Sequence, residues 1–457
     1  MYSTLLLNKI STNTETVGII GLGYVGLPLA VGFAQAGIKV IGFDKSQNKV
    51  DQINSGNNYI KDIRDAVLRE VVENITLTAT TDFTRIHECD ALLICVPTPL
   101  DKFRKPDMSY IESACIAIGQ NMKPGTFISL ESTTYPTTTE DLMLPIIEQE
   151  SGLKHGQDFW LAYSPERVDP GNASFHTKNT PKVLGAINKE GLDIGEKIYS
   201  KAIDHLHLVS SPKVAEMVKI LENTYRLVNI SLINELALLS GKMGIDIWEV
   251  IEAAKTKPFG FQAFYPGPGI GGHCIPLDPF YLEHIAKKYD FDLSMIHTAG
   301  HINMRMPHYM VIKISTALNQ HKKPINGSRI LFLGVAYKPN IDDARESPAL
   351  EIIDTIIKKG GIVSYFDPHI PSVITPAGNE LQSIQPSNHP TIQPSNNPTI
   401  QPSNHSTIQP SLLQSSDCVV ITTNHSVFDV EMIQQHARLI VDLRNVIKEP
   451  SEKVFKL

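Results

Sequence analysis

The first folded unit of this chain is indicated by the segment Thr16-Val-Gly-Ile-Ile-Gly-Leu-Gly-Tyr-Val-Gly26. Its apolar residues 17–20 predict a short buried strand, and the G-x-G-x-x-G pattern of Gly21, Gly23 and Gly26 follows at once. In this pattern the first glycine permits a tight turn, the second lets the backbone approach a pyrophosphate, and the third lets a helix pack closely on the strand. The segment therefore predicts a Rossmann-like unit that binds a dinucleotide.

The residues after this turn indicate which dinucleotide is bound. A helix to about Ala36 and a strand over Lys39–Phe43 lead to Asp44, 23 residues after Gly21. A carboxylate here accepts hydrogen bonds from both ribose hydroxyls and repels a 2′-phosphate, so we expect NAD and not NADP. The alternative is a glycine-rich turn without a ligand. The uncharged stretch 16–38 is long enough to imitate a membrane span, but its six glycines favour a buried strand, turn and helix, and we expect no membrane partner.

The composition is that of an ordinary folded protein. The 457 residues carry a formal net charge of −7, with 42% hydrophobic and 19% charged residues, which excludes wholesale disorder. No basic stripe is present, so we expect no nucleic-acid partner. The five cysteines are widely spread without CxxC spacing, which predicts no disulfide framework, no metal site and a cytoplasmic location. Residues 1–15 carry no signal-peptide pattern and are expected to form a frayed, polar leader.

Alternating apolar strands and helical segments predict the organisation of the chain. Ala91–Val96 and Thr126–Leu130 continue the first unit as strands of a parallel sheet, and a second alternating unit starts at Arg329. Between them, Lys213–Met243 has helical periodicity after a Ser-Pro start. We therefore expect an α/β fold with two Rossmann-like, doubly wound parallel-sheet domains joined by a long central helix. The expected domains are 1–210 for NAD binding, 211–325 for dimerisation, and 326–457 for substrate binding. We expect a homodimer or a higher homo-oligomer that forms through the long helix.

An internal repeat interrupts the second α/β unit. The octapeptides at 384–391, 392–399 and 400–407 are near copies, and residues 381–416 contain no Lys, Arg, Asp or Glu. One apolar residue and recurring proline in each copy are too little to bury a core. We interpret 381–416 as a low-complexity insertion in a surface loop, because loop length costs closure entropy only slowly. The alternative is a tether that binds a partner.

One cysteine stands apart from the others as a candidate nucleophile. Cys274 lies at the end of a run with four glycines and two prolines (265–274), beside polar groups, and a thiolate there can attack a carbonyl. The remaining cysteines are interpreted as small buried apolar residues, namely Cys89, Cys95, Cys115 and Cys418.

Polar residues elsewhere complete a catalytic constellation. Lys219 and Asn223 are four residues apart on the predicted long helix and face the same direction, so they can hold an oxyanion or a substrate hydroxyl. The plain alternative is a solvated helix face. Glu166 in Ser-Pro-Glu-Arg and Thr133 in Glu-Ser-Thr-Thr follow predicted strands, which is where α/β proteins build their sites.

Taken together, these motifs resemble the UDP-glucose/GDP-mannose dehydrogenase family of nucleotide-sugar 6-dehydrogenases. Further matches are Val96-Pro-Thr-Pro99, Gly271-Gly-His-Cys274 with Asp278, Gly334-Val-Ala-Tyr-Lys338 and Asp343-Ala-Arg-Glu-Ser347. The resemblance implies a four-electron oxidation of C6 of the sugar, from alcohol to carboxylate, with two NAD. It makes Cys274 the nucleophile of a thiohemiacetal and then a thioester, which water hydrolyses.

The same resemblance implies the roles of individual residues. Lys219 and Asn223 stabilise oxyanions, while Asp278 and Thr133 position water and assist proton transfer. Glu166 contributes to thioester hydrolysis and to the substrate pocket. The implied NAD contacts are Gly21, Gly23, Tyr24, Val25, Gly26, Asp44, Lys49, Thr98, Ser132, Thr133 and Arg345. The implied UDP-sugar contacts are Glu166, Arg167, Lys219, Asn223, Phe264, Tyr265, Gly267, Gly271, Lys338 and Arg444.

The segments 272–282 and 299–307 are most similar to the branch that acts on UDP-N-acetylglucosamine for surface polysaccharide and lipopolysaccharide synthesis. Val168-Asp-Pro-Gly171 departs from the UDP-glucose pattern, which often has a second glutamate there. UDP-glucose, UDP-N-acetylgalactosamine and UDP-N-acetylmannosamine stay open as substrates. A two-electron β-hydroxyacid dehydrogenase and an inactive nucleotide-sugar-binding protein stay open as functions.

Overall fold

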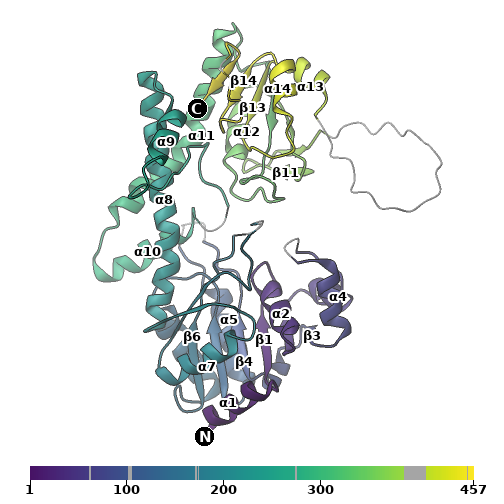
Figure 1. Cartoon of the computed structure of the whole chain (residues 1–457), viewed down its shortest axis with the longest axis vertical. Coiled ribbons are helices and arrows are strands. Elements are labelled where there is room, and N and C mark those ends of the chain that lie inside the picture. Colours follow the sequence, from purple (N-terminus) through teal and green to yellow (C-terminus); the bar gives the residue numbers. More distant parts are fainter. Residues whose placement is uncertain are drawn as a thin grey trace, which may run out of the picture. The chain divides into compact units, whose positions relative to one another are not determined.

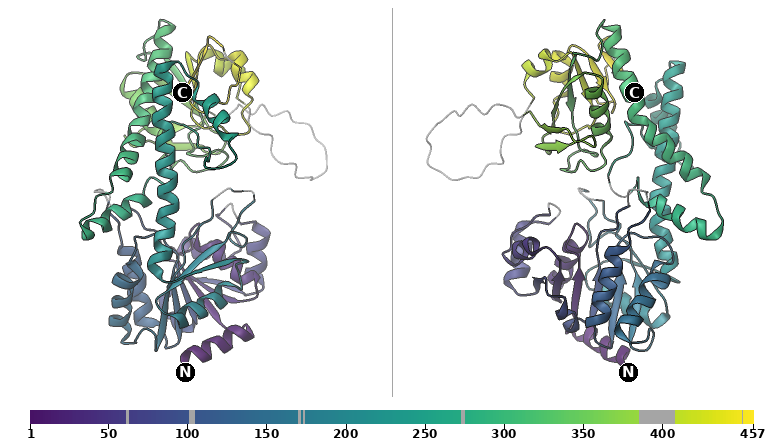
Figure 2. Two further views of the ribbon diagram at one scale, coloured as in Figure 1. Left: turned by 60° about the vertical axis from the view of Figure 1, so that its left-hand side comes forward. Right: turned by 180° about the vertical axis from the view of Figure 1, so that it is seen from behind.

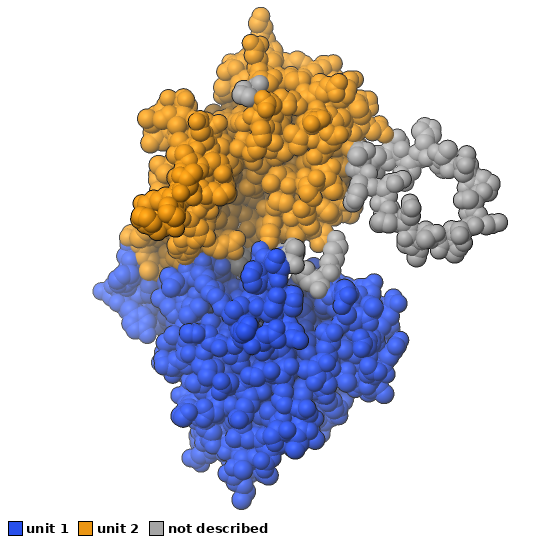
Figure 3. Space-filling view, in the orientation of Figure 1, with its two compact units in different colours: residues 1–223, 277–292 blue, residues 224–276, 293–457 orange. Residues whose placement is uncertain are grey.

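The computed structural model describes the chain except for residues 61–62, 101–104, 170–171, 173, 273–274, 385–407 and 450 (Figure 1). The described residues divide into two compact units, coloured separately in Figure 3. The first contains Met1–Asn223 and Leu277–Asp292, and the second contains Thr224–Pro276 and Leu293–Leu457. Helix α8 (Pro212–Met243) contributes to both units. The three domain boundaries expected from the sequence remain predictions.

An eight-stranded sheet forms the centre of the first unit, in the order β3-β2-β1-β4-β5-β6-β7-β8. Neighbouring strands are parallel except β6 and β7, which are antiparallel. This order contains the Rossmann arrangement 3-2-1-4-5-6 and confirms the expected doubly wound fold. The strands are β1 (Thr16–Ile20), β2 (Lys39–Phe43), β3 (Leu77–Thr80), β4 (Ala91–Ile94), β5 (Thr126–Leu130), β6 (Phe159–Tyr163), β7 (Lys182–Ala186) and β8 (Leu206–Val209).

Helices cover both faces of this sheet (Figure 2). In β1, Val17 and Ile19 enter one hydrophobic cluster while Ile20 enters another, as the two-residue period of a strand requires. The first cluster includes α2 (Gly26–Gln35) and α7 (Lys189–Tyr199), and the second includes α5 (Ser109–Asn121) and α6 (Leu144–Ser151). The other helical elements of this unit are α3 (Gln47–Asn54), α4 (Asp65–Glu73), η1 (Phe83–Glu88), η2 (Thr138–Met143), α10 (Asp278–Ala286) and η3 (Lys287–Tyr289).

The start of the chain is folded, so the expected frayed leader is wrong. Residues Tyr2–Thr12 form helix α1, in which Leu6 and Ile10 are buried in the same cluster as β1. Lys9 also pairs with the buried Asp90 at 2.8 Å. The two buried apolar residues of α1 are spaced four apart on one helix face, and their packing stabilises the segment against the first unit.

A five-stranded parallel sheet forms the core of the second unit, in the order β10-β9-β13-β14-β15. In β9 (Arg329–Leu333), Ile330 and Phe332 face α11 (Ser294–Gln320) and α12 (Pro348–Lys358), while Leu331 and Leu333 face α13 (Pro410–Ser415) and α14 (Val430–His436). The predicted second doubly wound sheet is therefore confirmed. Its other strands are β10 (Ile362–Phe366), β13 (Cys418–Ile421), β14 (Ile440–Asp442) and β15 (Val454–Lys456). Helix α9 (Ile247–Lys255) and the hairpin β11 (Ser372–Ile374) with β12 (Glu380–Gln382) complete the unit.

The described ends of the repeat-containing segment belong to this fold. Ile384 donates its N–H to the Tyr365 carbonyl at 2.9 Å, and Ile408 and Leu413 are buried. The segment 381–416 thus includes structured residues at both ends, and its repeats at 385–407 lie outside the described residues. No helix in the described part of the chain is long and apolar enough to cross a bilayer.

Candidate active site

The glycine-rich turn forms a cradle at the carboxyl end of β1. Gly21 has φ +93°, and a Cβ on Gly26 would lie 1.9 Å from the Gly21 carbonyl oxygen, so α2 can begin only with glycine here. A Cβ on Gly23 would instead meet open space. Gly23 thus leaves room for a ligand beside the first turn of α2, where backbone N–H groups favour an anion. Tyr24 is exposed and Val25 half-buried in this turn.

Asp44 lies beside this cradle, at the end of β2. Its carboxylate accepts hydrogen bonds from the N–H groups of Leu22 (3.0 Å) and Ser46 (2.9 Å) and pairs with Lys49 (3.1 Å). The side chain is therefore held at the mouth of the turn, where the ribose of a dinucleotide is expected. The open Gly23 and the anchored Asp44 fit NAD.

Thr98, Ser132 and Thr133 follow the neighbouring strands β4 and β5 at the same edge of the sheet. The Ser132 hydroxyl donates to the Val96 carbonyl at 2.7 Å, and the Thr98 carbonyl accepts from the Tyr281 hydroxyl. Thr98 and Ser132 are buried, and Thr133 is half-buried. Parallel strands bring these residues together because their carboxyl ends share one edge.

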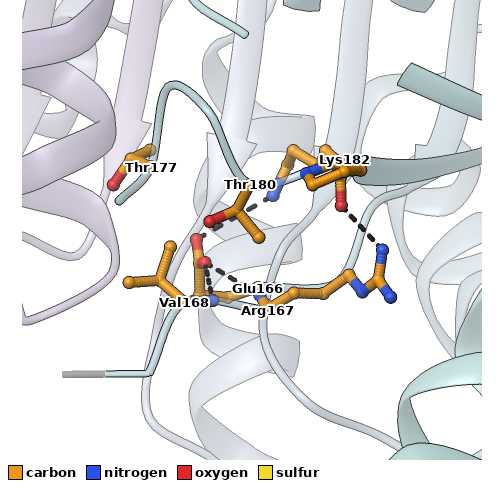
Figure 4. A pocket seen from close by; sticks show the side chains of 7 residues that line it. Glu166, Arg167, Val168, Thr177, Thr180 and Lys182 are labelled. Atoms are coloured by element: carbon orange, nitrogen blue, oxygen red, sulfur yellow. Dashed lines mark hydrogen bonds and ion pairs between the residues drawn. The ribbon is translucent and has the colours of Figure 1, made fainter. Parts of the chain in front are cut away.

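Glu166 and Arg167 follow β6 and line a small pocket (Figure 4). One Glu166 carboxylate oxygen accepts from the N–H groups of Arg167 (2.8 Å) and Val168 (2.7 Å), which fixes the turn. Arg167 pairs with Glu222 on α8 at 2.6 Å and donates to the Pro181 carbonyl at 2.7 Å. Arg167 is thus held by α8 and by the segment before β7.

Lys182 joins the loops after β5 and β6 and was missed from the sequence. Its ammonium lies 2.5 Å from Glu131, 3.9 Å from Glu166 and 3.3 Å from the Pro165 carbonyl. Burial lowers the pKa of Lys182, but Glu131 and Glu166 outweigh it and leave that pKa above its ordinary value. Because β7 is antiparallel to β6, its first residue lies at the edge where β6 ends. Glu131 also accepts a hydrogen bond from Tyr199, so this buried carboxylate contacts both a cation and a hydroxyl group.

Lys219 and Asn223 are one turn apart on α8, and Asp278 lies beside them. Lys219 donates to the Glu166 carbonyl at 2.8 Å, and Asn223 donates to the Asp278 carboxylate at 2.5 Å. Asp278 is only 2% exposed, and this burial raises its pKa to about 7, against the opposing effects of Lys219 and Asn223. A cation, an amide and a carboxyl group that can exchange a proton near neutral pH are therefore adjacent.

Glu216 occupies the same face of α8, one turn before Lys219. Its buried carboxylate accepts from the N–H groups of Thr137 (2.6 Å) and Thr139 (3.0 Å). Burial raises the pKa of Glu216 to about 7, while these hydrogen bonds lower it. Glu216 thereby ties the turn after Thr133 to α8. The spacing of Glu216, Lys219 and Asn223 at i, i+3 and i+7 is the sequence signal that was available for it.

The remaining substrate candidates lie in the second unit, where the glycine-rich loop meets the segments after β9 and β14. A Cβ on Gly267 would lie 2.5 Å from the Arg444 guanidinium, and a Cβ on Gly271 would lie 2.6 Å from Tyr337. The N–H of Gly272 donates to the Arg345 carbonyl at 3.1 Å. Only glycine permits these close approaches.

The aromatic residues of this loop are also held in place. The Phe264 ring packs edge-on against the Tyr225 ring, with 5.7 Å between the ring centroids. The Tyr265 ring stacks on the Trp248 ring, with 6.0 Å between the centroids. Lys338 is half-buried after β9, and the Arg345 side chain pairs with Asp343 at 2.6 Å.

The sequence predicts one nucleophilic cysteine and four buried apolar ones, and the structure describes the latter four. Cys274, the predicted nucleophile, lies outside the described residues. The four expected to be small buried apolar residues are all buried, namely Cys89, Cys95, Cys115 and Cys418. Burial also raises the pKa of each of these four thiols, which disfavours a reactive thiolate at these positions.

Comparison with known proteins identifies three consecutive parts of one family. The UDP-glucose/GDP-mannose dehydrogenase family matches with its NAD binding domain at residues 15–203, its central domain at 213–305 and its UDP binding domain at 331–449. A UDP-N-acetyl-D-glucosamine 6-dehydrogenase from Pseudomonas aeruginosa is 36% identical over 355 residues, which cover 78% of this chain and 83% of that protein. A UDP-N-acetyl-D-mannosamine dehydrogenase from Pyrococcus horikoshii is 33% identical over 440 residues, 95% and 96% of the two chains.

A solved structure supports the same assignment. The UDP-D-ManNAc dehydrogenase from Pyrococcus horikoshii superposes with a TM-score of 0.83 at 32% identity, covering 96% of this chain and 98% of that one. The chain therefore belongs to the UDP-glucose/GDP-mannose dehydrogenase family and is an NAD-dependent nucleotide-sugar 6-dehydrogenase.

Proposed function

We propose that this enzyme oxidises C6 of UDP-N-acetylglucosamine to the carboxylate. The proposed reaction is supported by the proximity of the Lys219, Asn223 and Asp278 side chains beside the Glu166 loop. The 36% identity to a UDP-N-acetyl-D-glucosamine 6-dehydrogenase supports the substrate. We further propose that the reaction takes place in the cytoplasm and that the uronic acid product supplies surface polysaccharide synthesis.

The proposed reaction divides its roles among Cys274, Lys219, Asn223 and Asp278. Held at the Gly21–Gly26 turn beside Asp44, NAD would supply the hydride acceptor for each of the two oxidations of C6. Cys274 adds its sulfur to the C6 aldehyde, so that the substrate is held until C6 reaches the level of a thioester. Lys219 and Asn223 stabilise the C6 oxygen when negative charge develops on it, and Asp278 assists the proton transfer. Water then cleaves the C–S bond, which releases the carboxylate and the free thiol.

Other predicted contacts are proposed to position the two ligands. Thr133 positions water, and Glu166 assists hydrolysis of the thioester. The proposed NAD contacts are Gly21, Gly23, Tyr24, Val25, Gly26, Asp44, Lys49, Thr98, Ser132 and Arg345. The proposed UDP-sugar contacts are Arg167, Phe264, Tyr265, Gly267, Gly271, Lys338 and Arg444.

The surroundings of Arg444 are the most direct indication that the substrate is an anion. The residue is half-buried, its Nε donates to the Thr422 carbonyl at 2.8 Å, and no carboxylate of the described residues pairs with it. Burial of the guanidinium lowers the pKa of Arg444 to about 10. A half-buried cation without a carboxylate is costly unless a ligand supplies the negative charge, and the diphosphate of a UDP-sugar does so.

UDP-N-acetylmannosamine is the second candidate substrate. It is favoured by the 33% identity to a UDP-N-acetyl-D-mannosamine dehydrogenase, which extends over 95% of this chain. The two sugars differ only in configuration at C2. We rank the N-acetylglucosamine derivative first because of the segments 272–282 and 299–307.

The experiment is a comparison of initial rates of NADH formation with four UDP-sugars at equal concentration. We expect the highest kcat/KM with UDP-N-acetylglucosamine, and lower values with UDP-N-acetylmannosamine, UDP-N-acetylgalactosamine and UDP-glucose. A higher kcat/KM with another sugar would overturn the substrate assignment.

The Cys274→Ser variant is expected to lose turnover or to trap an intermediate. Unchanged turnover would overturn the covalent mechanism and favour a two-electron dehydrogenase.

We propose that residues 1–210 bind NAD, residues 211–325 form the dimer interface, and residues 326–457 bind the UDP-sugar. The enzyme is then a homodimer that forms through α8. In the second unit, α8 exposes an apolar stripe of Leu232, Leu236, Leu239 and Met243, whose spacing of three and four residues places them on one side of the helix. A second copy of the same helix is a self-complementary partner. Light scattering should give twice the chain mass of 50.5 kDa, and Leu236→Glu with Leu239→Glu should give the monomer. A monomeric wild-type protein would contradict this.

A further inference from the structure

A row of buried polar side chains in the second unit links α8, α11 and the glycine-rich loop. The N–H of Gly267 donates to Oδ1 of Asn234 at 2.9 Å. Nδ2 of Asn234 donates to Oδ1 of Asn303 at 2.8 Å. Nδ2 of Asn303 donates to the Ser231 hydroxyl and, at 3.1 Å, to the Ala299 carbonyl. Asn234 is 0% exposed and Asn303 is 8% exposed, so these hydrogen bonds are shielded from water.

The backbone groups at the two ends fix the orientation of both amides. The N–H of Gly267 can only donate, so the oxygen of Asn234 must face it. The nitrogen of Asn234 is then left to face the oxygen of Asn303, whose nitrogen faces the Ala299 carbonyl, which can only accept. Donation in the row therefore has one direction, from the loop through α8 to α11, and each amide depends on its neighbour.

The loop residue at the end of this row lies against Arg444. A Cβ on Gly267 would be 2.5 Å from Nη1 of Arg444, so the peptide of Gly267 and the guanidinium are in close contact. The guanidinium is also held by the Thr422 carbonyl, which accepts from its Nε. A shift of the Gly267 peptide would therefore move the surface on which Arg444 rests.

We infer that Asn234 and Asn303 are positioning residues, which hold the Gly267 peptide against Arg444 and so prepare the anion-binding part of the UDP-sugar site before the ligand arrives. This inference rests on the proposed role of Gly267 and Arg444 in binding the UDP-sugar. A loop that is already fixed loses little conformational freedom on binding, and that saving appears as affinity. Neither asparagine touches the reacting carbon in this role, so its loss weakens binding and leaves the chemical step largely intact.

The test uses UDP alone as the probe, with calorimetry on the full-length protein, followed by steady-state kinetics with the best UDP-sugar. Asn234→Ala is expected to raise the Kd for UDP and the KM for the UDP-sugar by about tenfold or more, the factor expected from about 1.4 kcal/mol of lost binding. The KM for NAD and kcat should stay within about threefold. Asn303→Ala keeps the hydrogen bond from Gly267 to Asn234 and is expected to give a smaller rise in the same two constants.

Three further variants separate the explanations. Asn319→Ala removes an exposed asparagine from α11 and should bind UDP as the wild type does. Gly267→Ala should weaken UDP binding, and combining it with Asn234→Ala should add little, because both act on the same peptide. Arg444→Ala tests the proposed function itself, since UDP binding that survives it would overturn the role of Arg444. An unchanged Kd for UDP in Asn234→Ala and in Asn303→Ala would overturn the inference while leaving the proposed function intact. A fall in kcat with no change in Kd would also overturn it.

Discussion

At the scale of single residues, burial determines what the polar groups of the site can do. Asp278 is enclosed beside Lys219 and Asn223, and burial raises its pKa to about 7. A carboxyl group with such a pKa can both accept and donate a proton near neutral pH. The same burial makes its charged form unfavourable, so the group is suited to catalysis and costly for stability.

Asp278→Asn is expected to lower kcat by roughly 10²- to 10⁴-fold, the usual contribution of general acid–base catalysis. In the wild type, kcat should fall as the pH drops below about 7, because Asp278 becomes protonated and can no longer accept a proton. The variant should lose this limb of the profile. A pH–rate series on both proteins measures it, and a wild-type profile that is flat between pH 6 and pH 8 would contradict the role of Asp278.

The same substitution should raise the melting temperature above pH 7. The folded-state pKa of Asp278 lies above that of an unfolded aspartate, so the native state binds more protons between about pH 4 and pH 7 and loses stability as the pH rises through this window. The amide that replaces the carboxyl group in the variant does not titrate. The difference in melting temperature between variant and wild type should therefore be larger at pH 8 than at pH 5, by calorimetry. Equal differences at both values would refute this explanation.

Lys182 is expected to be important for stability, because its loss leaves Glu131 buried without a cation. Lys182→Met should lower the free energy of unfolding by about 3–5 kcal/mol, and adding Glu131→Gln should restore part of it. Lys189→Met, at a side chain 87% exposed, is the matched control and should change little. Urea unfolding of the four proteins measures these effects, and a double variant no more stable than Lys182→Met would argue against the ion pair.

At the scale of helices and strands, local patterns predicted most of the observed elements. The strands Lys39–Phe43 and Thr126–Leu130 and the long helix ending at Met243 have the expected extents, because apolar runs between glycines and a long uninterrupted helical period are strong local signals. Helix α1 was missed because only two of its apolar residues, Leu6 and Ile10, are buried, and their partner surface is far away in the sequence. Lys182 was missed for a similar reason, since its position depends on the antiparallel pairing of β7.

Helix α1 should contribute measurably to the stability of the first unit. Ile10 is 2% exposed, so Ile10→Ala should cost about 2–5 kcal/mol of unfolding free energy. Leu5→Ala, at a residue 55% exposed on the same helix, is the control and should cost far less. Chemical denaturation distinguishes the two. Equal small losses would mean that α1 does not pack on the first unit in solution.

At the scale of the whole molecule, the site residues come from many parts of the chain. The spacing of residues in the sequence predicts only some of the contacts between them. The pair Lys219 and Asn223 was readable from the helix period. The contact of Gly267 with Arg444 joins residues 177 positions apart and depends on the tertiary fold. Family motifs indicated both residues, but only the structure explains why the loop needs glycine at that position.

The octapeptide repeats are expected to be dispensable for catalysis. Replacing residues 385–407 by a short Gly-Ser linker should leave kcat/KM within about twofold, because loop length changes closure entropy only slowly. Ile384 and Ile408 should be kept, since both pack in the second unit. Steady-state kinetics of the shortened enzyme measures this. A large loss of activity with an unchanged melting temperature would instead favour a functional tether.

The amount of NADH formed per sugar consumed shows whether a four-electron oxidation is completed on one enzyme. With limiting UDP-N-acetylglucosamine and excess NAD, absorbance of NADH and chromatography of the sugar give the ratio. We predict two NADH for each UDP-sugar consumed, with the uronic acid as product. One NADH for each sugar, with an aldehyde released, would rule out a four-electron oxidation.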